Sequence, residues 1–205
     1  MENVVLQPTA IGDAITCKGD ATITLTGSNS LTAKSNYSPD VSTSGSGIYV
    51  ESGTLTIDGE GSLYISRTYV NNRFMSIGAG IGAGDGANIV IKRGNISIDS
   101  SSSTGFESGA GIGGLDGEQC GNITITGGTI SIGEPYSYAA CIGSVSTGNC
   151  GNITISGEST VITYTKGRYA NGIGSSIIGE CGTVTIGDGV TINNTKYTDT
   201  QTGPL

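Results

Sequence analysis

The sequence predicts an all-β protein, a single-stranded right-handed parallel β-helix (solenoid) with six coils of three short strands. Three observations lead to this fold class. Gly accounts for 36 of 205 residues, about 18% against ~7% in ordinary proteins. The chain has 26 Ile and only 7 Leu, and such a β-branched bias favours strands over helices. An Ile between small residues also recurs every 30 to 33 residues, which indicates a structural repeat.

Three strand motifs follow one another in each repeat. The first is centred on Ile15, Ile48, Ile81, Ile112, Ile142 and Ile173. The second begins its apolar pair at Ile23, Leu55, Ile89, Ile123, Ile153 and Val184. The third falls at Leu31, Leu63, Ile96, Ile130, Val161 and Val190. Each motif alternates apolar and polar residues, so each strand points one row inward and one outward.

The repeats form one predicted domain over residues 1–205, which we expect to be part of a larger protein. The coils are expected at about 12–33, 45–65, 78–98, 109–132, 139–163 and 170–193. Left-handed hexapeptide helices have shorter, stricter coils, so the length of these units favours the right-handed kind. A β-propeller needs four strands in each blade, and only three motifs are found in each repeat. Neither end of the sequence shows an obvious cap.

Two polar columns precede the second motif. Asn88, Asn122 and Asn152 share one position, and their amides are expected to satisfy backbone groups at a tight corner. Cys120, Cys150 and Cys181 occupy another position, two residues earlier. In-register Cβ vectors point the same way and suit a disulfide poorly, so we expect a stack of buried thiols here.

Glycines flank the first motif on both sides, and bare backbone in a strand indicates that something approaches closely. We expect a groove on this glycine face, walled by loops that follow the third motif of each repeat. Tyr rings can stack on sugars, and Arg can hold a uronate carboxylate. The candidate ligand-binding residues on these loops are Tyr69, Arg73, Phe74, Tyr136, Tyr138, Tyr164, Arg168 and Tyr169. The alternative is that these rings pack the loops onto the solenoid.

Acidic residues lie in the turns after the first motif. Asp85, Asp116 and Glu118 fall on neighbouring repeats, and stacked turns offer the carboxylate and carbonyl oxygens that Ca²⁺ prefers. A weak Ca²⁺ site is therefore one prediction, and solvated turn acids are the alternative. No other cofactor is indicated.

Charge and composition exclude several classes of function. The net charge of −8 opposes nucleic-acid backbones and anionic membranes. No apolar run approaches the ~18 residues that a membrane-spanning segment needs. The absence of His removes the commonest general base and zinc ligand. The start of the sequence shows no signal peptide, yet we expect an extracellular or cell-surface location because we interpret the chain as part of a surface protein.

The run GAGIGG…CGNITITGGTISI resembles the Gly-rich β-helical repeats of secreted and cell-surface bacterial proteins, over about residues 12 to 193. Some of those proteins are classed as carbohydrate-binding and have a pectate-lyase-like solenoid. The resemblance implies a noncatalytic polysaccharide-binding or adhesin module with a polysaccharide or cell-surface glycan as partner. A polysaccharide lyase or glycoside hydrolase is the first alternative, but hydrolysis needs two facing carboxyl groups, and the first motif carries Gly and Ile instead. A structural spacer, with open ends that associate end to end, is the second.

Overall fold

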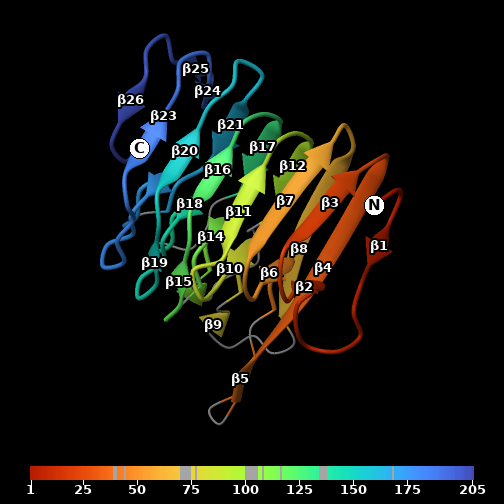
Figure 1. The fold of residues 1–205 in the computed structure, drawn as a ribbon. Helices are drawn as coiled ribbons and strands as arrows, with labels where there is room; N and C mark the ends of the chain where they lie inside the picture. The colour runs from red at the N-terminus through yellow and green to blue at the C-terminus, as the bar shows by residue number, and fades with distance from the viewer. Residues whose placement is uncertain are drawn as a thin grey trace.

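The structure is a computed structural model. It describes residues 1–38, 41–43, 45–69, 75–76, 78–99, 106–107, 109–115, 117–133, 138–167 and 169–205, with the backbone alone for 36–38, 41–43, 69, 75–76 and 106–107. None of these residues is helical, so this part of the chain holds no helix that could span a membrane. The strands stack into a parallel β-solenoid, with the termini at opposite ends (Figure 1).

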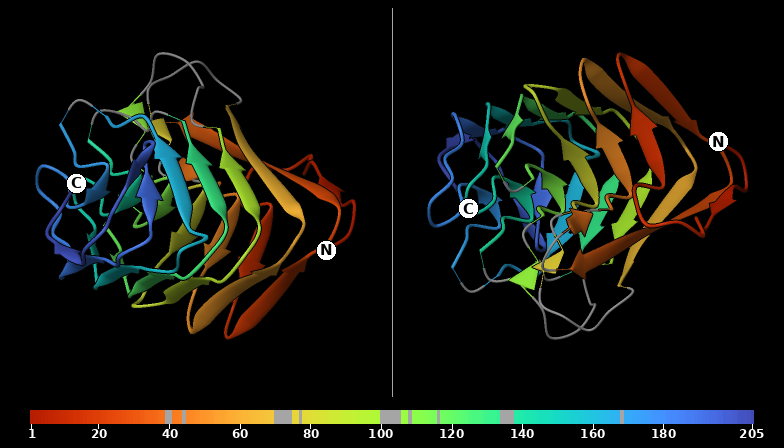
Figure 2. Two further views of the ribbon diagram at one scale, coloured as in Figure 1. Left: turned by 90° about the horizontal axis from the view of Figure 1, so that it is seen from above. Right: turned by 90° about the horizontal axis from the view of Figure 1, so that it is seen from below.

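Three long sheets form the sides of the solenoid (Figure 2). The six-stranded sheet contains β2 (Ile15–Cys17), β6 (Ile48–Val50), β10 (Ile81–Ala83), β14 (Ile112–Gly113), β18 (Ile142–Gly143) and β22 (Ile173–Gly174). The seven-stranded sheet contains β3 (Ala21–Leu25), β7 (Thr54–Gly59), β11 (Asn88–Ile91), β16 (Ile123–Ile125), β20 (Ile153–Ile155), β23 (Val184–Ile186) and β26 (Gln201–Thr202). All neighbours within the six-stranded sheet pair in parallel.

The nine-stranded sheet contains β1 (Val5–Leu6), β4 (Ser28–Ser38), β5 (Val41–Thr43), β8 (Ser62–Tyr69), β12 (Asn95–Ile98), β17 (Thr129–Ile132), β21 (Val161–Tyr164), β24 (Thr191–Ile192) and β25 (Thr195–Lys196). Two small pairs add β9 (Met75–Ser76) with β13 (Phe106–Glu107), and β15 (Gln119–Cys120) with β19 (Asn149–Cys150). Each long sheet thus takes one strand from each of the six repeats, and the four inner coils have neighbours on both sides. The right-handed sense stays a prediction from coil length.

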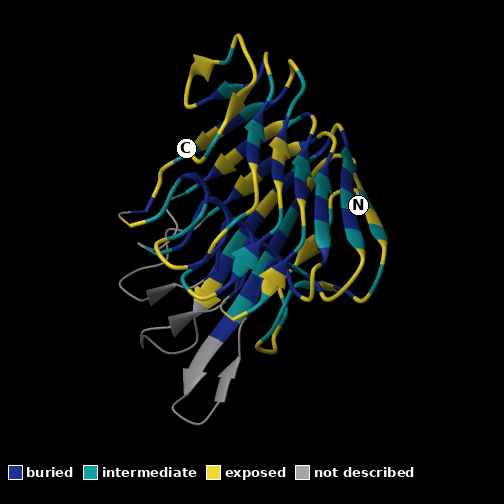
Figure 3. Ribbon diagram, turned by 60° about the vertical axis from the view of Figure 1, so that its left-hand side comes forward, coloured by how far each residue is buried: buried dark blue, intermediate teal, exposed yellow. Residues whose placement is uncertain are grey.

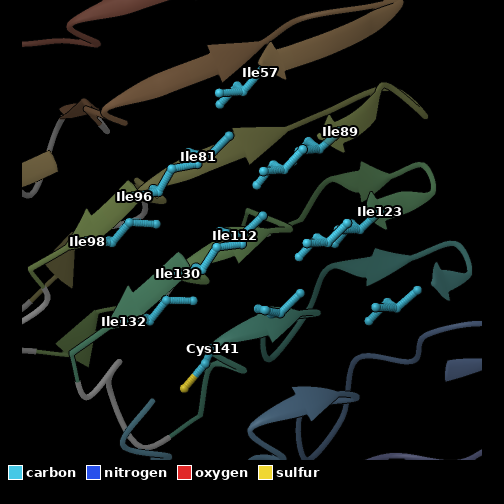
Figure 4. Packing of buried hydrophobic residues seen from close by; sticks show 14 of the residues in the cluster. Ile57, Ile81, Ile89, Ile96, Ile98, Ile112, Ile123, Ile130, Ile132 and Cys141 are labelled. Atoms are coloured by element: carbon cyan, nitrogen blue, oxygen red, sulfur yellow. The ribbon is translucent and has the colours of Figure 1, made fainter. Parts of the chain in front are cut away.

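The register of the six-stranded sheet confirms the first motif. Ile15, Ile48, Ile81, Ile112, Ile142 and Ile173 pair in one column across the sheet. Parallel in-register stacking brings like side chains together at the ~4.8 Å spacing of neighbouring strands. Columns of Ile from all three sheets meet inside the solenoid and form its core (Figure 4).

The other two motifs need correction in the first, fifth and sixth repeats. Leu55 pairs with Ala21 rather than with Ile23, and Leu63 pairs with Asn29 rather than with Leu31. In the fifth and sixth repeats Ile162 and Ile192 occupy the column predicted for Val161 and Val190. The predictions at Ile23, Leu31 and Val190 are wrong by two residues, a slip that keeps the same face inward, so alternation alone did not distinguish those registers. The prediction at Val161 is wrong by one residue, and Val161 faces outward. The third strands β4 and β8 also run past the predicted coil limits of 33 and 65.

The Asn column stacks as predicted, and it acts through the backbone. The Oδ1 of Asn88 accepts the N–H of Asn122 (2.8 Å), and the Oδ1 of Asn122 accepts the N–H of Asn152 (2.9 Å). The next link runs from Asn152 to the N–H of Thr183 (2.8 Å). Asp20 does the same for Thr54 at the other end of the column (2.9 Å). Each side chain therefore satisfies a backbone donor of the following coil at the corner.

The predicted stack of thiols is wrong for two of its three members. Cys150 and Cys181 form a disulfide whose Cα atoms lie 4.5 Å apart. They sit in a bridge of the parallel ladder, where the close Cα approach brings both sulfurs within bonding reach. Cys120 pairs in register with Cys150 and remains a buried thiol, whose pKa is raised by burial to about 12. Cys17 and Cys141 are also buried thiols.

The two ends of the solenoid differ, and the expectation that neither is capped is wrong at the C-terminal end. There β25 pairs antiparallel with β24, and β26 pairs antiparallel with β23. Leu205 exchanges two backbone hydrogen bonds with Ile173, both 2.9 Å, so all three sheets of the last coil gain a partner. At the other end β1 covers β4, while β2 and β3 are the last strands of their sheets.

Candidate functional site

The predicted glycine face is closed, because the space above each Gly is filled from within the protein. Gly47, Gly80 and Gly111 are buried. A Cβ on Gly47 would lie 2.2 Å from Cγ2 of Ile65, a side chain of the third strand in the same coil. On Gly80 it would lie 2.5 Å from Cγ2 of Ile98. These glycines make room for core side chains, so this column does not form an external groove.

Glycines on the other side of the Ile column are covered from outside. A Cβ on Gly82 would meet the side chain of Leu115 at 2.9 Å, and one on Gly84 would overlap the Glu118 carboxylate. Tyr49 donates its hydroxyl to Glu118 Oε2 at 3.0 Å and so bridges two coils across this surface. Burial, and then the charge of Glu118, raises the pKa of Tyr49 to about 12. The six-stranded sheet is therefore sealed along the described inner coils.

The predicted aromatic and basic residues fall into two groups. Arg73, Phe74, Tyr136 and Arg168 lie outside the described residues, as does the side chain of Tyr69. Tyr138 and Tyr169 come together, with ring centroids 5.2 Å apart and an interplanar angle of 19°.

Tyr164 has a packing position. It stands in register with the core residue Ile132, packs against the core, and its ring fills the space beside Gly172. Burial raises the pKa of its hydroxyl. The placement explains this ring by packing, which was the alternative that the sequence left open.

The predicted acids are not gathered into a cation site by the described residues. Asp116 lies outside them, Asp85 is exposed, and Glu118 accepts the Tyr49 hydroxyl. Among the described side chains no group of three or more Asp, Glu, Cys or His residues is placed to hold a metal. The Ca²⁺ site stays a prediction.

An open polar surface lies elsewhere, on the outer side of the nine-stranded sheet. We call it the hydroxyl face and define it by two adjacent rows across β8, β12, β17 and β21. The rows contain Tyr64, Ser97, Ser131 and Thr163, and Ser62, Asn95, Thr129 and Val161. All are exposed except Ser62 and Val161, which are half-buried. Figure 3 shows how buried and exposed residues alternate along the strands.

Tyr64 is the one aromatic ring of the hydroxyl face. The residue is 43% exposed, and its hydroxyl donates to Asp99 Oδ2 at 3.0 Å. Burial, followed by this bond, raises the pKa of Tyr64. The contact crosses from β8 to the residue after β12 and fixes the ring on the sheet. Sequence reasoning missed this residue, although the outward positions of the third motif read Ser, Tyr, Asn, Ser, Thr and Ser.

Two shallow depressions join at this face. One of about 250 Å³ is lined by Ser62, Leu63, Tyr64, Asn95, Ile96, Ser97, Thr129 and Ser131. The other, of about 510 Å³, lies at the corner between the seven-stranded and nine-stranded sheets and includes Gly59, Glu60 and Gly61. Both include Ser62 and Asn95. We call the joined depressions the trough.

The two acids at this corner, Asp58 and Glu60, both form salt bridges with Arg93. Arg93 donates to Asp58 Oδ1 and Glu60 Oε1, each at 2.7 Å. The bond from Arg93, with the Gly59 N–H, holds the pKa of Asp58 below its usual range. The Arg93 guanidinium therefore bridges the two carboxylates beside the trough.

Comparison with known proteins adds no relative. No protein-family model, curated protein or solved structure was found to match this chain.

Proposed function

We propose that this chain is a noncatalytic carbohydrate-binding module, of the kind carried by secreted or cell-surface proteins, and that it binds glycan on the hydroxyl face. The observation that supports this most directly is the exposed Tyr64 ring, fixed by Asp99 among rows of Ser and Thr. A ring held in place offers a sugar an apolar stacking surface at little entropic cost. Hydroxyls beside it can both donate to and accept from sugar hydroxyls.

Two further observations agree with this proposal. The Cys150–Cys181 disulfide is the kind of bond that persists in oxidising, extracellular compartments. The net charge of −8 disfavours nucleic acid and anionic membrane surfaces as partners. Glycoside hydrolysis would need two carboxyl groups facing one bond, whereas the described acids beside the trough are already bonded: Asp58 and Glu60 to Arg93, and Asp99 to Tyr64. The noncatalytic role therefore has the stronger support.

The test is a glycan array probed with the wild-type chain and two tyrosine variants. Tyr64→Ala should weaken binding about tenfold, the loss of roughly 1.4 kcal/mol expected for a stacking ring. Tyr169→Ala is the matched control, because both tyrosine residues are 43% exposed, and it should leave binding unchanged.

Two results would contradict the proposal. Absence of any bound glycan removes the function itself. Loss of binding in Tyr169→Ala, with Tyr64→Ala unaffected, moves the site to the Tyr138–Tyr169 pair. Thermal melting of both variants checks that each remains folded.

A further inference from the structure

We infer that the ligand of the hydroxyl face is a linear, uncharged polysaccharide that lies across the strands, along the axis of the solenoid. This inference rests on the proposed function and specifies its ligand. It follows from the direction of the rows, the course of the trough and the charges that line it.

The hydroxyl face repeats across the strands, from one coil to the next. Ser97 pairs in register with Tyr64 on one side and Ser131 on the other, and Ser131 pairs with Thr163. Neighbouring strands lie ~4.8 Å apart, so similar groups recur at that interval from coil to coil. Along any one strand, by contrast, the face offers two outward positions in these rows. A ligand that repeats its own chemistry gains most contacts by crossing the strands.

The trough also crosses the strands. The smaller depression already spans three successive strands, β8, β12 and β17. The larger one continues from Ser62 and Asn95 towards the corner at β3 and β7. Glycine lets neighbouring coils pack closely at that corner, because a Cβ on Gly59 would lie 2.3 Å from the Leu25 carbonyl oxygen. The hollow therefore runs from coil to coil, and it is shallow, which suits a polymer laid on a surface rather than a small enclosed ligand.

The charged groups beside the trough disfavour an acidic ligand. No Lys or Arg is among the residues that line either depression. Glu60 lines the corner, and Asp99 lies beside Tyr64. Arg93 lies at this corner, but Asp58 and Glu60 share its guanidinium, so the three groups together keep a net negative charge. A uronate or sulfated chain would meet these groups and Asp99, and like charges at close range repel. Ser, Thr and Asn side chains instead match the hydroxyls of an uncharged sugar.

These features make a specific prediction about chain length. We expect each coil of the hydroxyl face to form one or two weak hydrogen bonds with the sugar, so affinity should rise as the oligosaccharide covers more coils. Titration calorimetry with glucose and mannose oligomers of two to six residues tests this, with galacturonate oligomers of equal length as the charged comparison. We expect at least one neutral series to bind about tenfold more tightly at four residues than at two, and galacturonate to bind more weakly at every length.

A substitution in the middle of the row locates the ligand. Ser131→Lys places a long side chain two strands from Tyr64 and should reduce the affinity of the longer oligomers to that of the disaccharide. Thr124→Lys is the matched control, because Thr124 points outward at the neighbouring β16 on the seven-stranded sheet, and it should bind like wild type. Melting curves confirm that both variants fold.

The outcomes separate this inference from the function on which it rests. Affinity that does not change with length, or that survives Ser131→Lys, overturns the axial orientation and leaves a carbohydrate-binding module. Tighter binding of galacturonate overturns the uncharged ligand. Absence of binding to every oligomer and to the glycan array overturns the proposed function as well.

Discussion

The six-stranded sheet and the hydroxyl face of the nine-stranded sheet use the same parallel pairing but have opposite surfaces. In the first, glycines are buried because Ile65, Ile98 and the Tyr49–Glu118 pair occupy the space that their side chains would take. In the second, hydroxyl side chains stand outward and stay exposed. Strand pairing sets the direction of every row, whereas the side chains around each row decide whether a face is closed or open.

The largest effect should come from adding a side chain to the closed sheet. Gly111→Val would place a Cβ 2.6 Å from both the Cys141 carbonyl oxygen and Ile132 Cγ2. Backbone cannot move aside cheaply, so we expect a loss of about 4 kcal/mol or more in the free energy of unfolding. Urea denaturation followed by circular dichroism measures it.

Gly19→Ala is the control for this substitution, because its Cβ would meet nothing within 4 Å. It should leave stability within about 0.5 kcal/mol of wild type. If the Gly111→Val variant is as stable as wild type, the six-stranded sheet has room for a side chain, and the contrast between a closed sheet and the open hydroxyl face is wrong.

The next effect concerns the disulfide at the corner after the six-stranded sheet. Reduction of Cys150–Cys181, which closes a sequence separation of 31 residues, should lower the free energy of unfolding by about 3 kcal/mol. Urea denaturation with and without dithiothreitol measures the loss. A Cys150→Ala/Cys181→Ala variant should be insensitive to the reductant, and a reductant effect that persists in it would point to another bond.

The Asn column at the same corner should have a smaller effect. Asn122→Ala removes the acceptor of the Asn152 N–H, and we expect a loss of about 1 kcal/mol because the group is partly solvated. Asn122→Asp should retain most of the stability, since Asp20 serves Thr54 in the same way. If Asn122→Asp lowers the stability as much as Asn122→Ala does, a carboxylate cannot replace the amide oxygen at this position. Thermal melts compare the three proteins.

The smallest effect belongs to the corner beside the trough. Arg93 is the main cause of the lowered pKa of Asp58. A lowered folded-state pKa contributes stability that is complete above the ordinary value of 3.8 and is lost as pH falls through the lowered value. Arg93→Gln should therefore raise the pKa of Asp58, measured by carboxyl NMR, and should lower the stability at neutral pH only slightly, because an exposed ion pair contributes little. An unchanged pKa would mean that another group lowers it.

The sequence predicted the core better than the surfaces. Six Ile residues at near-constant spacing fixed the first column without ambiguity, because no neighbouring residue offers the same pattern. Val161 was predicted to occupy the core column that Ile162 occupies, because both residues are β-branched and only contacts across strands show which one points inward. Leu31 was misplaced by two residues, a shift that preserves the alternation of faces.

The candidate site shows a different limit. Glycine beside the first motif correctly indicated close approach, but the approaching atom belongs to Ile65, 18 positions away from Gly47, and not to a ligand. That contact depends on how the third strand returns over the first. Tyr64 was passed over because it lies inside a strand, whereas the sequence reasoning searched the loops. The alternation of Ser62, Tyr64 and Ser66 with buried Leu63 and Ile65 was the signal that could have shown its exposure.

The closed C-terminal end has a consequence for how such a molecule can change in length. β25, β26 and Leu205 complete the last coil using residues that follow it, so termination is independent of the number of coils before it. A copy of an inner repeat could be inserted or removed between two others while the terminal structure stays intact. The length of the solenoid is thus set by its number of coils, and each added coil would lengthen the hydroxyl face by one strand.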